Sequence, residues 1–227
     1  ATDAAAIRAH LQTLAQFPDH WPCIAFSNHD VIRAATRFGQ TNARAMLALL
    51  CALRGTILLY QGEELGLPEV PLRRDQLKDP VGDLYYPLFK GRDGCRTPMP
   101  WDDSKPGLGF SRGAPWLPLG ADHAALAVSR QEGDGASALA YTRKLLAARK
   151  AHPALRTGTL TLLPGDGLAF LREAEGERIV CAFNLGTQDI QLDLPGPAQA
   201  LDLGTGEARL TGSSLMLGAG AAWFGIF

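Results

Sequence analysis

The character of the sequence changes near residue 157, and this change limits the folds that the chain can adopt. Residues 158–227 consist of short strand-forming segments separated by glycine-containing turns. About eight segments at this spacing predict a small antiparallel β-sandwich. We expect strands at residues 160–163, 168–172, 178–184, 189–194, 199–202, 207–211, 215–217 and 221–227.

Before this point, helices alternate with short strands. Apolar residues at helical spacing predict helices over residues 3–16, 41–54 and 136–151. Strands are predicted over residues 21–26 and 56–60, and the second is a continuous β-rich run of the kind that is buried on both faces of a parallel sheet. The alternation indicates an α/β fold with parallel strands.

A long segment rich in proline and glycine, at about residues 67–122, separates the second predicted strand from the last helix. A loop of this length in a compact domain is usually either functional or disordered. Aromatic residues such as Tyr85, Phe89 and Trp101 favour an ordered, functional loop, because disordered segments contain few aromatics.

The charge pattern excludes several classes of partner. The net charge is −1 and the charged residues are interspersed, so neither nucleic acid nor an anionic membrane is expected to bind. A small neutral substrate fits this composition better. No apolar run is long enough to span a bilayer, and the first residues do not form a secretory signal. We expect a cytoplasmic protein, with the periplasm as the alternative for a processed precursor.

The cysteines do not indicate a metal or disulfide framework. The four residues are widely separated and form no C-x-x-C pair, so we expect buried thiols at Cys23, Cys51, Cys95 and Cys181.

Three polar residues, Asn28, His29 and Asp30, directly follow the first predicted strand. In an α/β barrel the carboxyl ends of the strands face the mouth of the active site, so this position makes all three candidates for substrate contact. The alternative is that Asn28 or Asp30 caps the following turn while His29 fills a gap in the core.

Three segments together resemble one enzyme family. The run from Trp21 to Gly39 resembles the fourth sequence region of the α-amylase superfamily, glycoside hydrolase family 13, in its α-glucosidase branch. Gly55 to Gly66 is similar to the region at the family's eighth barrel strand. Gly91 to Trp101 resembles the Arg-Asp-x-x-Arg-Thr-Pro-Met-x-Trp segment of α-glucosidases and oligo-1,6-glucosidases.

The resemblance implies a specific architecture. Residues 1–157 are expected to form the C-terminal part of a (β/α)8 TIM barrel, about its last two β/α repeats, with the long loop at about 67–122 following strand eight. Residues 158–227 are expected to form the family's C-terminal β domain, an antiparallel sandwich.

The resemblance also assigns roles to individual residues. Asp30 corresponds to the catalytic carboxylate that stabilises the transition state, and His29 would donate a hydrogen bond to a sugar hydroxyl beside it. Asn28 would contact the same glucosyl unit. Arg96 corresponds to an arginine that holds the non-reducing-end glucose, because its planar fork of donors suits vicinal hydroxyls and a carboxylate partner.

Other side chains have two interpretations each. Arg33 would reach the aglycone side of the substrate, or it occupies a solvent-exposed helix position. Arg92 acts in the site or forms a loop salt bridge with Asp93. Glu63 and Glu64 are catalytic carboxylates or, as the family resemblance favours, structural residues.

Retaining glycoside hydrolysis needs a nucleophilic carboxylate and a second carboxyl that acts as acid and then as base. In the family these groups lie on earlier strands, and we find no matching segment in this sequence. The chain is therefore expected to be part of a retaining, exo-acting α-glucosidase for short substrates such as maltose, small oligosaccharides or sucrose-like glucosides. Its expected partner is the N-terminal barrel portion of the same enzyme, and the isolated fragment is expected to be inactive.

Two alternatives remain open. One is a transglucosidase or a sucrose- or trehalose-converting relative. The other is a catalytically inactive, amylase-like binding or partner subunit. No metal or cofactor is expected from the residues present, although calcium or another cation would be possible through the N-terminal part.

Overall fold

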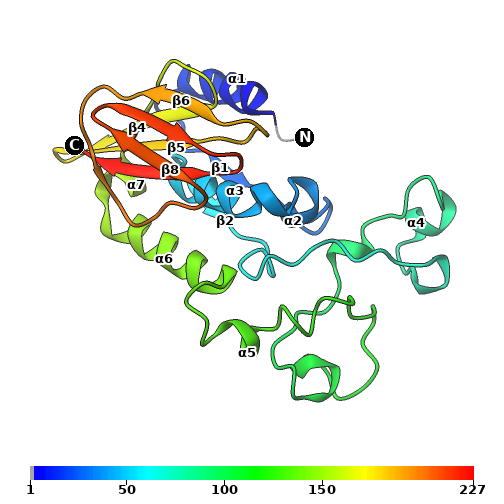
Figure 1. Ribbon diagram of the computed structural model, residues 1–227. Helices are drawn as coiled ribbons and strands as arrows, with labels where there is room; N and C mark the ends of the chain where they lie inside the picture. The colour runs from blue at the N-terminus through cyan, green and yellow to red at the C-terminus, as the bar shows by residue number, and fades with distance from the viewer. Residues whose placement is uncertain (1–2) are drawn as a thin grey trace. The chain divides into compact units, whose positions relative to one another are not determined.

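The computed structural model describes residues 3–227 and contains two compact units (Figure 1). The first unit combines the described residues up to Ile24 with Phe38–Leu58 and Lys144–Phe227. The second combines Ala25–Arg37 with Leu59–Arg143. The domain boundary that we expect near residue 157 stays a prediction.

The first unit contains helices α1 and α3 and the part of α6 from Lys144 onward. Helix α1 spans Ala4–Ala15, and the Asp3 carboxylate caps it by accepting the backbone N–H groups of its first turn. Helix α3 spans Gln40–Ala52 and is buried from Ala45 onward, which explains why its apolar residues surround the helix. Helix α6, Ala138–Ala151, is followed by the short helix α7, Pro153–Thr157.

Two strands lie before the long loop. Strand β1 spans Cys23–Ala25 and strand β2 spans Thr56–Leu58, and they pair in a two-stranded sheet. Both are shorter than predicted. The expectation that the second strand is buried on both faces is wrong for the described residues, since Leu58 is 52% exposed. The physical reason is that a sheet of only two strands does not supply the neighbours that would cover these strands.

Each segment that was expected as a strand after residue 158 forms one. A five-stranded sheet has the order β3-β4-β5-β10-β7, and a three-stranded sheet has the order β6-β9-β8, with antiparallel pairing throughout. The strands are β3 Thr159–Leu162, β4 Leu168–Ala174, β5 Glu177–Phe183, β6 Ile190–Asp193, β7 Gln199–Ala200, β8 Ala208–Thr211, β9 Ser214–Leu217 and β10 Ala222–Ile226.

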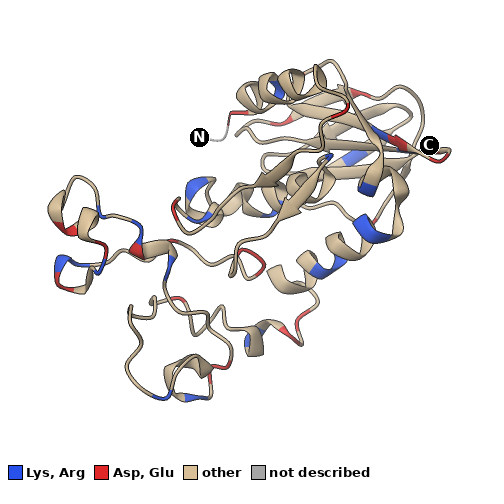
Figure 2. Cartoon of the chain, turned by 180° about the vertical axis from the view of Figure 1, so that it is seen from behind, with Lys and Arg blue, Asp and Glu red and all other residues tan. Residues whose placement is uncertain are grey.

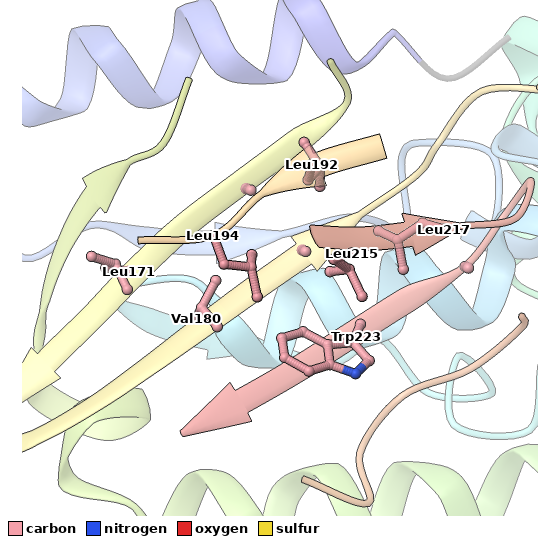
Figure 3. Packing of buried hydrophobic residues seen from close by; sticks show 10 residues of the cluster. Leu171, Val180, Leu192, Leu194, Leu215, Leu217 and Trp223 are labelled. Atoms are coloured by element: carbon pink, nitrogen blue, oxygen red, sulfur yellow. The ribbon is translucent and has the colours of Figure 1, made fainter. Parts of the chain in front are cut away.

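The two sheets share a hydrophobic core (Figure 3). Alternate residues of β4, β5 and β10 point into it, among them Leu171, Val180 and Trp223, and they meet Leu215 and Leu217 of β9. The intervening residues form the opposite face of the larger sheet, against which α1, α3 and α7 pack. This period of two gives the larger sheet two buried faces.

Buried arginines join the segments of the first unit. Arg172 of β4 is fully buried, and its guanidinium donates to the carbonyl groups of Ala52, Gly158 and Thr159. Arg149 of α6 donates to carbonyl groups in the last turn of α3 and just after it, those of Cys51, Leu53 and Gly55, and to that of Leu155. Carbonyl groups at the end of a helix lack internal partners, so these arginines satisfy them. Burial lowers the pKa of Arg172 to about 10.

The second unit consists mainly of loops with short helical turns. The expected long loop contains η1 Arg74–Gln76, α4 Pro80–Leu84, η2 Asp93–Cys95 and η3 Pro106–Gly109. Helix α2, Ala34–Arg37, precedes it and helix α5, Val128–Gln131, follows it. The unit is ordered by buried polar side chains. Gln131, for example, donates to the carbonyl groups of Leu65 and Leu126 and accepts from the backbone of Leu139.

Basic and acidic residues are interspersed along the chain, as the composition indicates (Figure 2). Within residues 3–227, no helix has the length and the apolar character needed to cross a membrane. Cys51, Cys95 and Cys181 are buried, as expected, whereas Cys23 is exposed and departs from the expectation. The difference at Cys23 has the same cause as the exposure of Leu58, because both residues belong to the two-stranded sheet.

The shared core of the two sheets predicts a contrast between neighbouring residues. Leu217 is fully buried, so Leu217→Ala should lower the free energy of unfolding by about 2–5 kcal/mol. Met216 precedes it on the same strand and is 40% exposed, so Met216→Ala should change stability by about 0.5 kcal/mol or less. Urea denaturation measures both values. Equal losses would contradict the placement of the core.

Candidate active site

Asn28, His29 and Asp30 lie on an exposed turn after β1. The Asn28 side-chain oxygen accepts the backbone N–H of Asp30 at 2.8 Å, so Asn28 does cap this turn. His29 has a side chain that is 69% exposed, and the alternative that it fills a gap in the core is wrong. The Asp30 carboxylate is 49% exposed.

Two arginines converge on one oxygen of Asp30. Arg96 Nη2 lies 2.9 Å from Asp30 Oδ1, and Arg92 Nη1 lies 3.3 Å from the same atom. Arg96 also donates through Nε to the carbonyl oxygen of His29 at 2.7 Å. The imidazole Nε2 of His29 lies 3.4 Å from the other carboxylate oxygen, Oδ2. The structure thus brings together His29, Asp30 and Arg96, as expected, and adds Arg92.

Arg92 is fixed by a buried carboxylate. Its Nε donates to Asp79 Oδ2 at 2.8 Å and its Nη2 to Asp79 Oδ1 at 3.1 Å. The Asp79 side chain is inaccessible to solvent. The hydrogen bonds from the Arg92 side chain hold the pKa of Asp79 well below its usual range, and Asp79 in turn raises the pKa of Arg92.

The alternative of an Arg92–Asp93 salt bridge is wrong. The Asp93 carboxylate points instead to the preceding part of the loop, where it accepts the backbone N–H groups of Lys78 at 2.5 Å and Asp79 at 2.7 Å. Adjacent residues in a helical turn do not face each other, so the Asp93 carboxylate has its partners on another segment.

Arg33 does not join the cluster at Asp30. It is only 2% exposed; its Nη1 donates to the Gln61 carbonyl at 2.7 Å, and its guanidinium lies over the Tyr60 ring at 5.2 Å. Burial lowers its pKa. A solvent-exposed position is therefore wrong for Arg33, and burial also argues against the substrate-binding role expected for it.

Tyr60 and the turn that follows β2 contact the segment that carries Arg96. The Tyr60 hydroxyl donates to the carbonyl of Cys95 at 3.1 Å, directly before Arg96. Glu63 accepts the Tyr60 backbone N–H at 3.1 Å, and Glu64 accepts that of Gly62 at 2.7 Å. Burial raises the pKa of Glu63. Both glutamates thus stabilise the turn after β2, in agreement with the structural interpretation.

A pocket opens beside Asp30 in the second unit. Its volume is about 400 Å³, within the range of small-molecule sites. Charged groups and apolar side chains share its wall, a combination that suits a sugar ring. The lining residues include Asp30, Ile32, Arg37, Glu69, Phe89 and Arg92.

The described residues offer no metal site. Within residues 3–227, no group of three or more histidine, cysteine, aspartate or glutamate side chains is arranged to hold a metal ion. The chemistry that the cluster at Asp30 supports is hydrogen bonding to hydroxyl groups and stabilisation of positive charge.

Sequence reasoning missed Asp79. A signal was present, because Asp79 followed by Pro80 is typical of the first residues of a helix, and Asp79 does cap α4 by accepting the Val81 N–H. This signal predicts the cap, but it does not predict that the same carboxylate binds Arg92 thirteen residues later along the chain.

Comparison with known proteins shows which family the chain resembles. The family model for the α-amylase catalytic domain matches residues 2–158. A probable α-glucosidase of Rhizobium meliloti (strain 1021) is 46% identical over 186 residues, which cover 78% of this chain and 34% of that protein. A probable oligo-1,6-glucosidase 2 of Bacillus subtilis (strain 168) is 30% identical over 210 residues, which cover 79% and 37%. The chain thus spans about a third of the length of these curated relatives.

Solved structures agree with this result. The α-glucosyl transfer enzyme XgtA superposes with a TM-score of 0.92 at 45% identity, covering 100% of this chain and 44% of that one. A trehalulose synthase, MutB, superposes with a TM-score of 0.87 at 25% identity, covering 100% and 47%. Enzymes that are named for different activities therefore share this fold.

The buried pair of Asp79 and Arg92 predicts a pH dependence of stability. Because the pKa of Asp79 is depressed below 3.8 in the folded state, the stability it provides is present above that value and is lost as the pH falls. Asp79→Asn should therefore lower the free energy of unfolding most at neutral pH. The difference in this free energy between the variant and the wild type should become smaller below about pH 4. Urea denaturation between pH 3 and pH 7 measures this difference.

Asp75 provides a matched control in the same loop. It pairs with Arg73, but both side chains are more than two-thirds exposed, at 68% and 69%. Asp75→Asn should change stability little at any pH, because exposed ion pairs contribute little. A difference between Asp79→Asn and the wild type that stays constant from pH 7 to pH 3 would contradict the assignment.

Proposed function

Because the chain belongs to the α-amylase family, we propose that it forms part of a retaining, exo-acting α-glucosidase that hydrolyses terminal α-glucosidic bonds. The observation that carries the proposal is the exposed Asp30 carboxylate, which is held by Arg96 and Arg92 at the edge of a pocket. The family match and the similarity to proteins named as α-glucosidases and oligo-1,6-glucosidases support it.

In this proposal Asp30 stabilises the transition state. Two guanidinium groups occupy its Oδ1, so Oδ2 is the oxygen that accepts hydrogen bonds from glucose hydroxyls. These bonds strengthen as the ring flattens toward the oxocarbenium-like transition state. His29, beside Oδ2, donates to a neighbouring hydroxyl, while Asn28 fixes the turn and contacts the same glucose.

Arg96 has two tasks in this scheme. Through Nη2 it orients Asp30, and through Nε it fixes the His29 backbone. The remaining guanidinium edge holds the non-reducing-end glucose, for which its planar set of donors is suited.

The two carboxyl groups that break the bond are proposed to lie in the N-terminal barrel portion of the same enzyme. Retaining hydrolysis places them about 5 to 5.5 Å apart across the glycosidic bond. The N-terminal portion is thus the partner of this chain. Any calcium or other cation would be bound there, and no cofactor is proposed for the present residues. A cytoplasmic location fits the proposal, with the periplasm as the alternative.

The substrate is proposed to be a short α-glucoside such as maltose, a small oligosaccharide or a sucrose-like glucoside. The part of the site that this chain contributes has a volume of about 400 Å³, which admits a sugar ring. The relatives named as oligo-1,6-glucosidases support short oligosaccharides.

Glucosyl transfer is the second candidate. The similarity to XgtA, an α-glucosyl transfer enzyme, and to a trehalulose synthase favours a transglucosidase or a sucrose- or trehalose-converting enzyme, in which a sugar acceptor replaces water. The ratio of transferred to released glucose from maltose distinguishes the two. A catalytically inactive binding or partner subunit is disfavoured by the arrangement of His29, Asp30 and Arg96, which a scaffold does not need.

Asp30→Asn in the complete enzyme should lower kcat by several orders of magnitude, because a neutral amide stabilises the developing positive charge far less. Turnover of p-nitrophenyl α-glucoside measures the loss, and the melting temperature shows whether the fold is retained. Asp83→Asn is the control, since Asp83 forms an exposed pair with Arg74. Near-normal kcat in Asp30→Asn would refute the assigned role.

The purified 227-residue chain should release no glucose from maltose or p-nitrophenyl α-glucoside, since the proposed nucleophile and acid/base belong to the N-terminal portion. The complete enzyme, assayed in parallel, is the positive control. Measurable turnover by the shorter chain would show that these groups lie within it.

A further inference from the structure

We propose that Asp79 is a positioning residue for Asp30 and acts through Arg92. The inference rests on the proposed function, in which Asp30 contacts the glucose, and it adds a residue that touches no substrate. Asp79, Arg92 and Asp30 lie in the same compact unit.

The three guanidinium nitrogens of Arg92 bind two different carboxylates. Nε and Nη2 bind the two oxygens of Asp79, and Nη1 lies on the side toward Asp30. A guanidinium group is planar, so two bonds to one carboxylate fix the direction of the remaining nitrogen. The position of Nη1 is therefore set by Asp79.

Asp79 is itself held in place by its neighbours. Its carboxylate is buried and accepts four hydrogen bonds, from Arg92 Nε and Nη2 and from the backbone N–H groups of Arg92 and Val81. Its own backbone N–H donates to Asp93 at 2.7 Å. A buried charge that loses its partners is costly, so this arrangement has little freedom to change.

The backbone near Arg92 is shaped for this contact. Gly91 has a φ of +71°, and a Cβ added there would lie 2.8 Å from Asp79 Oδ2 and 2.9 Å from the Cα of Gly82. Glycine is the residue that permits both the left-handed conformation and the close approach. The loop thus brings Arg92 against Asp79 through a conformation that other residues would strain.

The two arginines restrict the orientation of the Asp30 carboxylate. With Arg96 and Arg92 both at Oδ1, rotation of the Asp30 carboxylate is restricted, and Oδ2 keeps a fixed direction beside His29. Catalytic groups lose much of their effect when they are misplaced by about 1 Å, a cost on the order of 10²-fold. By fixing Arg92, Asp79 therefore also fixes the orientation of the Asp30 carboxylate.

A double-mutant cycle in the complete enzyme tests the inference. Asp79→Asn should lower kcat about tenfold with little change in KM, because the contact of Asp30 strengthens in the transition state. In an Arg92→Gln background, Asp79→Asn should lower kcat less than about twofold, because its route to Asp30 is already lost. Asp75→Asn should leave kcat unchanged. Equal losses in both backgrounds, or no loss in either, would overturn the inference.

A second measurement on the complete enzyme does not depend on activity. In ¹⁵N-arginine NMR, the Arg92 Nε–H should exchange with solvent at least about tenfold more slowly than that of Arg73, whose pair with Asp75 is exposed. Asp79→Asn should abolish this protection and change the side-chain ¹³C signal of Asp30, and Asp75→Asn should do neither. An unchanged Asp30 signal in Asp79→Asn would overturn the inference. Absence of glucosidase turnover in the wild-type complete enzyme would refute the proposed function instead.

Discussion

A guanidinium group withdrawn from water needs hydrogen-bond acceptors, and this requirement holds together segments in both compact units. In the first unit, Arg172 and Arg149 donate to carbonyl groups at the ends of α3 and α7, where helices leave acceptors unpaired. In the second unit, Arg33 donates to the Gln61 carbonyl after β2 and lies over the Tyr60 ring. Backbone carbonyls thus provide partners for buried cations without buried carboxylates of opposite charge.

At the candidate site the same requirement is met with carboxylates, and the result is a graded series of charges. The Asp79 side chain is inaccessible, that of Arg92 is 38% exposed, and that of Asp30 is 49% exposed. The buried end supplies rigidity, since breaking it would leave a charge without a partner. The exposed end supplies a carboxylate oxygen that substrate can reach. A loop with few regular elements can therefore present a group in one orientation.

Membership of the α-amylase family explains why the polar residues of the site lie at the ends of strands. The turn with Asn28, His29 and Asp30 follows β1, and the Tyr60 network follows β2, so both lie where strands end. In barrels of this kind, catalytic groups come from the carboxyl ends of several strands. Under the proposed function, the N-terminal portion of the enzyme would supply the remaining catalytic groups.

The sequence by itself determined the three longer helices and the strands after residue 158, because periodicity and caps are local signals. Its short motifs, through the family resemblance, singled out His29, Asp30 and Arg96. Only the tertiary structure decided that Arg92 pairs with Asp79 rather than with the adjacent Asp93, and that Arg33 is buried. Both outcomes depend on which distant segments meet, and on the burial that results. A charged residue in a sequence has several possible partners, and the choice among them is made when the loop packs and water is excluded.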